Sequence, residues 1–223
     1  MKNVIRVGEG KSIDVTLSEN LLKLNVEMAS ENRDLLRKHG IRTIDVMGSI
    51  GSGKTSLVAE MVKRLKKGYR LAFIAGDLST TIDSDRIEEH GVDVIQINTG
   101  KMCHLDANLV KKALELLDLN SIDLLFIENV GNLICPAGFQ LGSDQRIVIV
   151  SVTEGPYMVI KHPISFIDAN VVVINKIDLA EAMDIDIIEL ERDALNINPN
   201  LKVVRTNCRS GEGVAKVIEA LGL

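Results

Sequence analysis

The segment GSIGSGKT, residues 48–55, constrains the fold of this chain more than any other feature. It matches the pattern G-x-x-x-x-G-K-[ST], whose glycines let the backbone curl so that its N–H groups face phosphate oxygens. The motif follows a β-branched run at residues 42–47 and opens a helical segment near residues 54–67, which is the context that it requires. The sequence therefore predicts a P-loop NTPase domain.

Short β-branched runs alternate with helical segments along the rest of the chain. This alternation predicts an α/β fold with a mostly parallel seven-stranded sheet and helices on both faces. We expect strands at residues 42–47, 70–75, 93–97, 123–128, 146–152, 170–175 and 202–205. We expect helices near residues 54–67, 80–90, 104–118, 181–196 and 213–221. Ligands bind such sheets at the carboxyl ends of the strands, so we expect the site in the loops there.

The first 40 residues are expected to form a tail and an amphipathic helix that packs on the core. Within residues 19–39, Leu21, Leu24, Met28 and Leu35 recur at helical spacing, and Gly40 ends the pattern. Residues 1–17 have weak periodicity, which fits a tail or a short edge strand. Residues 41–223 form the expected GTPase domain, and the whole chain reads as a single globular domain.

Composition excludes several classes of partner. Of the 223 residues, 46% are hydrophobic and 26% are charged, and the net charge of −5 gives no reason to expect nucleic acid. No apolar run reaches the roughly 18 residues of a membrane span, and the amino-terminal segment lacks the apolar stretch of a secretory signal. We therefore expect a cytoplasmic protein without a membrane partner, and its three cysteines argue against a disulfide framework.

The P-loop supplies the expected phosphate contacts. Lys54 reaches the β- and γ-phosphates, and Thr55 offers its hydroxyl to Mg²⁺ at the positive end of the following helix. The nucleotide-binding residues expected here are Gly48, Ser49, Gly51, Ser52, Gly53, Lys54, Thr55 and Ser56.

A second motif, NKID at residues 175–178, indicates guanine as the base. The Asp178 carboxylate can accept hydrogen bonds from N1–H and N2–H₂ of guanine, whereas adenine presents an acceptor at N1. Asn175 can bond the other side of the purine, and the stem of Lys176 can lie along the ring. Cys208, in the loop at residues 206–211, is expected to touch the base edge through its backbone.

Acidic residues after two strands are the expected Mg²⁺ ligands. Asp77 ends the second strand and is followed by Asp83, while Glu128 ends the fourth strand. Together with Thr55 they form the expected magnesium site. Glu128 opens the segment ENVGN, whose glycine N–H can sense the γ-phosphate.

The water-positioning residue is expected to be an acid. Many GTPases use a glutamine after the sensing glycine, but Asn132 stands there and is one methylene too short. We expect Asp83 first, with Asp77 and Lys54, to form the catalytic set. Asp85 is expected to face solvent or to pair with Arg86. Neither loop contains an evident catalytic arginine, so we expect slow intrinsic GTP hydrolysis.

Two cysteines and a histidine form a candidate metal site. Cys103 and His104 follow the third strand, and Cys135 follows the fourth, so all three meet if these strands end at the same edge. Thiolates and imidazole suit Zn²⁺ or Ni²⁺. Three ligands are one short of the usual four, which leaves room for water or for a second subunit. The alternative is that the Cys-His pair merely opens a helix and Cys103 packs in the core.

Several of these segments together resemble the HypB family of hydrogenase nickel-incorporation GTPases, from about residue 25 to the end of the chain. The most specific are CHLDA at 103–107 and ENVGNLICP at 128–136, and the others occur in the family's order: GSIGSGKT, IAGDLSTTIDSDRI, NTGKMCHLDA, VTEG and NKIDL. The resemblance implies a homodimeric SIMIBI-class GTPase that uses GTP, GDP and Mg²⁺ and helps deliver nickel to [NiFe]-hydrogenase precursors.

The same resemblance implies further partners and site residues. Cys103, His104 and Cys135 correspond to a Ni²⁺ or Zn²⁺ site where two subunits meet. Lys161, in the segment KHP, resembles a lysine that reaches the guanine site of the other subunit. The implied partners are a hydrogenase maturation accessory protein and the hydrogenase large-subunit precursor. Relatives often read G-G-G-C-H, so Lys101 and Met102 are departures that can alter the metal loop.

Three other functions share parts of this sequence pattern. A urease accessory GTPase shares the P-loop logic but carries Cys-Pro-His where this chain has Cys-His. A P-loop nucleotide kinase is a second rival, against which the NKID segment speaks. The third is a structural, zinc-bridged dimer that also binds GTP.

Overall fold

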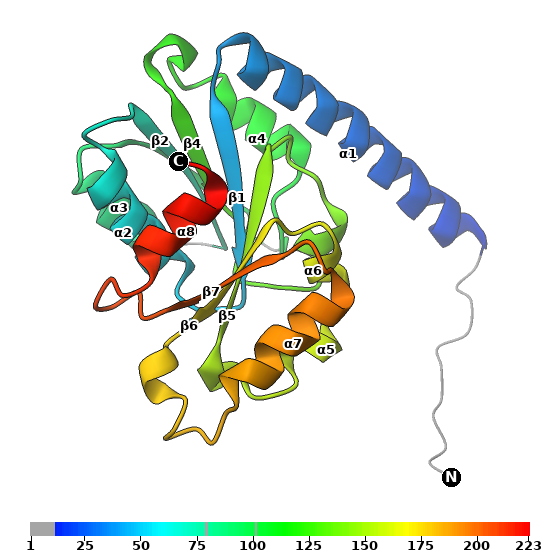
Figure 1. Ribbon diagram of the computed structural model, residues 1–223. Helices are drawn as coiled ribbons and strands as arrows, with labels where there is room; N and C mark the ends of the chain where they lie inside the picture. The colour runs from blue at the N-terminus through cyan, green and yellow to red at the C-terminus, as the bar shows by residue number, and fades with distance from the viewer. Residues whose placement is uncertain (1–11, 79, 101) are drawn as a thin grey trace.

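The computed structural model describes residues 12–223 except residues 79 and 101. Its centre is one parallel sheet of seven strands in the order β3-β2-β4-β1-β5-β6-β7 (Figure 1), as predicted. The strands are β1 (Arg42–Gly48), β2 (Leu71–Asp77), β3 (Asp93–Asn98), β4 (Leu124–Glu128), β5 (Gln145–Ser151), β6 (Val171–Asn175) and β7 (Lys202–Thr206).

Helices cover both faces of the sheet, because the central strands are apolar on both sides. One face is covered by α2 (Lys54–Leu65), α3 (Ile82–Glu88) and α8 (Val214–Leu221). The other is covered by α1 (Ser12–Lys38), α4 (Ala107–Leu114), α5 (Met158–Lys161), α6 (Ile164–Ile167) and α7 (Ile187–Ile197). Short 3₁₀ helices lie in the loops: η1 (Leu119–Ser121), η2 (Pro136–Gly138), η3 (Val152–Glu154) and η4 (Ile177–Leu179).

Two predicted helices begin later than expected because an aspartate caps each of them. The Asp106 carboxylate accepts a hydrogen bond from the backbone N–H of Leu109 at 2.8 Å, so α4 starts at Ala107. Asp186 likewise caps α7. Cys103 and His104 therefore lie in the loop between β3 and α4 and not in the first turn of a helix.

Helix α1 is longer than predicted. It begins at Ser12, so residues 12–17 are helical and do not form a tail or an edge strand. Residues 1–11 lie outside the described residues. In Figure 1 the amino-terminal half of α1 extends away from the domain, while its carboxyl-terminal half runs beside α4.

The predicted apolar stripe of α1 is wrong in its leading residues, since Leu21 and Leu24 are each 55% exposed. A mixed face packs instead: Asn32 Nδ2 donates to the carbonyl of Ala107 at 2.8 Å and to that of Leu141 at 3.1 Å, and Leu36 packs in the core. Fixed hydrogen bonds to loop carbonyls thus decide which side of α1 faces the core. The buried residues of this face are Asn25, Ala29, Asn32 and Leu36.

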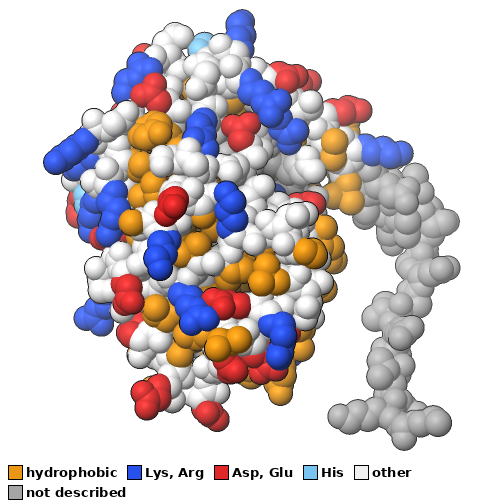
Figure 2. Space-filling model, viewed as in Figure 1, with side chains coloured by type: hydrophobic (Ala, Val, Ile, Leu, Met, Phe, Trp, Pro, Cys, Tyr) orange, Lys and Arg blue, Asp and Glu red, His pale blue; other side chains and the backbone are white. Residues whose placement is uncertain are grey.

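The molecular surface is mixed in charge. Figure 2 shows acidic and basic side chains interspersed over the face that it presents. In the part of the chain that the structure describes, no helix has both the length and the apolarity needed to cross a membrane.

Candidate nucleotide and metal sites

The P-loop forms a cradle between β1 and α2. Gly51 and Gly53 have φ values of 77° and 107°, a region that side chains disfavour. A Cβ on Gly53 would also lie 2.2 Å from Nδ2 of Asn175. The Ser52 hydroxyl is buried and has no hydrogen-bond partner among the described residues. Gly53 precedes the first turn of α2, and Gly51, Gly53 and Lys54 line the cavity, so this end of the helix fits phosphate oxygens.

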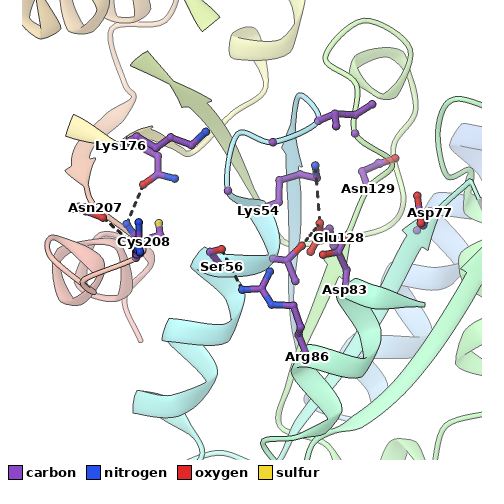
Figure 3. Close-up of a pocket in the computed structure, with 18 of the residues that line it drawn as sticks. Lys54, Ser56, Asp77, Asp83, Arg86, Glu128, Asn129, Lys176, Asn207 and Cys208 are labelled. Atoms are coloured by element: carbon purple, nitrogen blue, oxygen red, sulfur yellow. Dashed lines mark hydrogen bonds and ion pairs between the residues drawn. The ribbon is translucent and has the colours of Figure 1, made fainter. Parts of the chain in front are cut away.

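A cavity of about 600 Å³ extends from this cradle to the loops after β6 and β7. Lys54 and Glu128 lie at its phosphate end, and Lys176 and Cys208 lie at its base end (Figure 3). Twelve of the residues expected from the sequence to meet the nucleotide or Mg²⁺ thus line one cavity: Gly51, Gly53, Lys54, Thr55, Ser56, Asp77, Asp83, Glu128, Asn175, Lys176, Asp178 and Cys208. The expected Gly48, Ser49 and Ser52 are not in its lining. Leu179, Asn207 and Arg209 also line it.

Glu128 is the buried acid at the phosphate end. Thr55 Oγ1 donates to its Oε1 at 2.9 Å, and Nζ of Lys54 lies 3.9 Å from the same oxygen. Burial raises the pKa of Glu128 to about 7, although the Lys54 charge opposes the rise. Its Oε2 is buried without a hydrogen-bond partner among the described residues. A hard divalent cation beside Thr55 would bind this oxygen, so the residues present fit Mg²⁺.

Asp77 differs from the other expected Mg²⁺ ligands. It lines the cavity, but its carboxylate accepts hydrogen bonds from the backbone N–H groups of Leu78 and Thr80 and from the Thr80 hydroxyl. Burial raises the pKa of Asp77, and these hydrogen bonds outweigh that effect, so the net shift is downward. Asp77 therefore holds its own loop in this structure.

The Asn175 side chain braces two loops against each other. Its Nδ2 donates to the carbonyl of Ser52 at 2.8 Å, and its Oδ1 accepts from the backbone N–H of Cys208 at 3.0 Å. The oxygen and the nitrogen of the Asn175 side chain are thus both hydrogen-bonded within the protein. The hydrogen bond from Asn175 to the purine that the sequence predicts would be additional. This brace fixes the distance between the P-loop and the loop at residues 206–211.

Arg86 and Asn129 are two of the residues of this site that the sequence motifs did not predict. Arg86 lines the cavity, where its Nη2 lies 3.4 Å from the Ser56 hydroxyl, while the Asp85 carboxylate accepts from Thr81 instead. Asp83 and Arg86 are three residues apart on α3, a spacing that places them on the same side of a helix and was available in the sequence. Asn129 also lines the cavity, and its side-chain oxygen accepts a hydrogen bond from the backbone N–H of Leu105. This contact depends on how two loops approach each other, which the sequence does not reveal.

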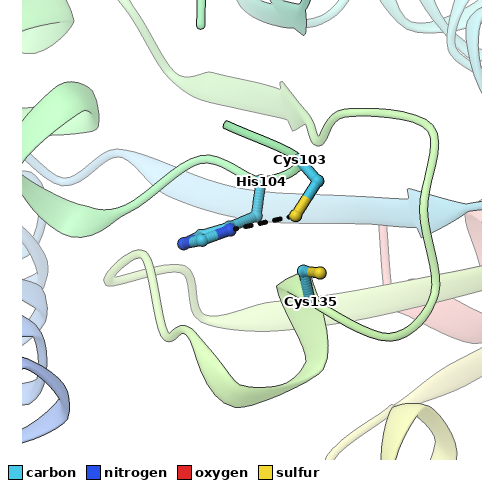
Figure 4. A group of neighbouring side chains, drawn as sticks. All are labelled: Cys103, His104 and Cys135. Atoms are coloured by element: carbon cyan, nitrogen blue, oxygen red, sulfur yellow. Dashed lines mark hydrogen bonds between the residues drawn. The ribbon is translucent and has the colours of Figure 1, made fainter. Parts of the chain in front are cut away.

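The three expected soft ligands converge beside the nucleotide cavity. The ligand atoms of Cys103, His104 and Cys135 all lie within 4.8 Å of one another (Figure 4). Sγ of Cys103 is 3.8 Å from Nδ1 of His104. Interaction with the Cys135 thiol and burial raise the pKa of Cys103, and burial lowers the pKa of His104. A neutral imidazole is the form that binds metal.

Surrounding residues hold this cluster in place. The His104 ring lies on Phe139 with 3.9 Å between ring centroids. Arg146 donates to the Phe139 carbonyl at 3.1 Å and pairs with buried Asp45 at 2.8 Å. Such outer contacts orient metal ligands.

Asn132 belongs to the metal side of the site. Its Nδ2 lies 3.4 Å from the Cys103 carbonyl, and its Oδ1 accepts from the backbone N–H of Ile134. It does not line the nucleotide cavity. The Asn132 side chain thus steadies the two loops that carry the thiols.

Of the remaining residues that the sequence singled out, Lys161 stands apart from both sites. Lys161 is exposed on α5, where its Nζ lies 5.8 Å from the Tyr157 ring centroid, and it does not line the cavity. Met102 is 40% exposed beside the cluster. Lys101, the other departure from the family pattern, lies outside the described residues.

Fold and cavity together define a P-loop nucleotide-binding protein in which two cysteines and a histidine lie close together near the nucleotide cavity. Residues 42–205 match the family model of the CobW/HypB/UreG nucleotide-binding domain. The probable hydrogenase maturation factor HypB of Methanocaldococcus jannaschii is 52% identical over 203 residues, which cover 91% of this chain and 92% of that protein. This chain belongs to the HypB hydrogenase maturation factors of the CobW/HypB/UreG family.

Solved structures agree with this membership. The crystal structure of HypB from Archaeoglobus fulgidus matches with a TM-score of 0.84 and 40% identity, over 90% of this chain and 98% of that one. That of HypB from Helicobacter pylori in complex with nickel matches with a TM-score of 0.83 and 33% identity, over 88% and 93% of the respective chains.

Proposed function

We propose that this chain is a GTP-hydrolysing metallochaperone that assists nickel insertion into a [NiFe]-hydrogenase precursor. One observation carries the proposal: a single loop after β4 serves both sites. Asn129 and Gly131 line the nucleotide cavity, and Cys135 in the same loop belongs to the candidate metal cluster. A nucleotide that reorders this loop would change the metal site.

GTP is the proposed nucleotide. Asp178 at the base end favours guanine, and the orphaned oxygen of Glu128 favours Mg²⁺ at the phosphate end. Asp83 is proposed to position the attacking water. Replacing Asp178 by asparagine should weaken GTP binding and strengthen XTP binding, because the amide then donates to the carbonyl oxygen of xanthine. A nucleotide kinase would instead phosphorylate a small acceptor.

Nickel is the proposed cargo, and zinc is the alternative occupant. Two thiols and one imidazole leave a fourth position open, which a second copy or water can supply. Exposed apolar side chains surround the cluster and the P-loop, as expected where two copies meet. They are Ile50, Met102 and Ile134, which are 80%, 40% and 69% exposed. The solved nickel complex of the Helicobacter pylori relative supports this choice of metal.

The proposed setting is a cytoplasmic homodimer that works with a hydrogenase maturation accessory protein and the large-subunit precursor. In such a dimer, Lys161 of one copy is proposed to reach the guanine site of the other. The homodimer and the two partner proteins are proposed from the role of the family in hydrogenase maturation.

The test is hydrogenase maturation in the host. The gene is deleted, and [NiFe]-hydrogenase activity is assayed at limiting and at excess nickel, with complementation by the wild type, Lys54→Ala and Cys103→Ala. Activity should be lost at limiting nickel, should return with the wild type, and should not return with either variant. Normal maturation in the deletion strain at limiting nickel would contradict the proposal. If only urease fails, the urease accessory function is supported instead.

The structural-zinc alternative has its own signature. Cys103→Ala would then abolish dimerisation while GTP turnover and hydrogenase maturation continue. A metallochaperone instead requires that maturation fail in this variant.

A further inference from the structure

Arg86 stands at the phosphate end of the nucleotide cavity. It comes from α3, whose residue Asp83 lines the same cavity. Its Nη2 lies 3.4 Å from the hydroxyl of Ser56, in the first turn of α2 directly after Lys54 and Thr55 (Figure 3). The guanidinium thus reaches across from one helix to the helix end where phosphates bind.

In the part of the chain that the structure describes, Arg86 is not in contact with a carboxylate, although its charge opposes the rise that burial causes in the pKa of Glu128. Among the described residues no ion pair within 4.0 Å involves Arg86. By contrast, Arg64 on α2 and Arg192 on α7 pair with glutamates of their own helices. An exposed arginine that faces a phosphate cradle with its donors available is suited to bind phosphate oxygens.

We propose that Arg86 is a catalytic arginine supplied in cis for GTP hydrolysis, which rests on the function proposed above. In this reaction the water oxygen forms a bond to the γ-phosphorus, and the bond from that phosphorus to the β–γ bridging oxygen breaks. The bonding electrons remain on GDP, and the water proton leaves with the released phosphate or passes to solvent. Arg86 donates hydrogen bonds to phosphate oxygens whose negative charge grows during this transfer.

A cis arginine is compatible with a slow switch. GTPases that carry their arginine in cis turn over at about 10⁻² s⁻¹, far below metabolic enzymes. The expectation of slow hydrolysis therefore stands, although the arginine itself is present on α3. An acid that positions water, Asp83, and a cation that stabilises charge would then occupy one helix face.

The experiment compares GTP hydrolysis by the full-length wild type, Arg86→Ala and Arg86→Lys in saturating Mg²⁺. Arg192→Ala is the matched control, because it removes an exposed helical arginine on α7. We expect Arg86→Ala to lower kcat by about 100-fold or more, with a smaller loss in Arg86→Lys and none in the control. The affinity for GDP with aluminium fluoride should fall by a similar factor, while the affinity for GDP alone should change by less than about threefold.

Other outcomes overturn the inference. A kcat for Arg86→Ala within about threefold of an active wild type leaves GTP hydrolysis in place and removes only the arginine's role. A loss that is seen only at limiting Mg²⁺ and is absent in saturating Mg²⁺ would show that Arg86 merely neutralises Asp83 and Glu128. If the wild type itself does not hydrolyse GTP, the proposed function fails and this inference fails with it.

Discussion

The side-chain oxygen of Asn129 accepts a hydrogen bond from the backbone N–H of Leu105 at 3.0 Å. Asn129 lines the phosphate end of the nucleotide cavity, next to Glu128. Leu105 is the next residue in the chain after His104, which belongs to the candidate metal cluster. Both Asn129 and Leu105 are fully buried. One buried hydrogen bond therefore joins the nucleotide loop to the metal loop.

Replacing Asn129 by alanine should uncouple the two sites. We expect nickel affinity to become equal with GDP and with a non-hydrolysable GTP analogue, because the metal loop no longer follows the nucleotide loop. The free energy of unfolding should fall by about 1–3 kcal/mol, since the N–H groups of Leu105 and Val130 lose their acceptor. Isothermal titration and urea unfolding measure the two effects.

Asn32→Ala is the matched control for this change. Asn32 is equally buried and hydrogen-bonds two carbonyls, but it lies on α1 away from the nucleotide. It should destabilise the fold by a similar amount and keep the nucleotide dependence of nickel affinity. Retention of that dependence in Asn129→Ala as well would remove the proposed link.

Cysteine substitutions should show that nickel affinity depends on Cys135 and not on Cys208. Cys135→Ser should weaken nickel binding by at least about 100-fold, because a ligand is lost and even outer-shell changes cost 10–100-fold. Cys208→Ser should leave nickel affinity unchanged, since Cys208 is buried at the base end of the nucleotide cavity. Competition with a chromogenic chelator measures the nickel affinity of both variants. An equal loss of nickel affinity in Cys135→Ser and Cys208→Ser would argue against the proposed metal cluster.

Two leucines test how α1 packs. Leu36 is 1% exposed, whereas Leu24 is 55% exposed. Leu36→Ala should lower the free energy of unfolding by about 2–5 kcal/mol, and Leu24→Ala should change it by less than about 0.5 kcal/mol. Urea unfolding compares them. A large cost for Leu24→Ala in the monomer would instead support the predicted leucine stripe.

The ion pair between Arg70 and Asp123 should make the free energy of unfolding depend on pH in the acidic range. Hydrogen bonds from Arg70 lower the pKa of Asp123 to about 2. Because its ordinary value is about 3.9, the pair stabilises the folded protein above that pH, and the contribution is lost as pH falls toward 2. Arg70→Gln should return the pKa of Asp123 toward its ordinary value in an NMR titration. The stability difference between wild type and variant should vanish at low pH, and a difference that persists there would contradict this assignment.

The sheet and the nucleotide loops were predictable because each depends on local pattern. Short β-branched apolar runs such as residues 171–174 favour buried strands, and GSIGSGKT and NKID carry their chemistry within a few residues. The convergence of Cys103 and Cys135 followed from the sheet, because β3 and β4 flank β2 in parallel and end at the same edge.

Features that depend on tertiary contacts could not be predicted in the same way. The packed face of α1 is chosen by hydrogen bonds from Asn25 and Asn32 to distant loops, which hydrophobic spacing does not reveal. The bond from Leu105 to Asn129 likewise depends on how two loops approach. The orientation of Arg86 was accessible, since its spacing from Asp83 already places both residues on one side of α3.

The most direct test of the central claim is the nickel affinity of the wild-type protein in its two nucleotide states. Dissociation constants for Ni²⁺ are measured in Mg²⁺ with GDP and with a non-hydrolysable GTP analogue. Coupling through the loop after β4 predicts a difference of at least about fivefold, and nickel must change the ratio of the two nucleotide affinities by the same factor. Equal nickel affinities in the two states would contradict a nucleotide-gated metal site.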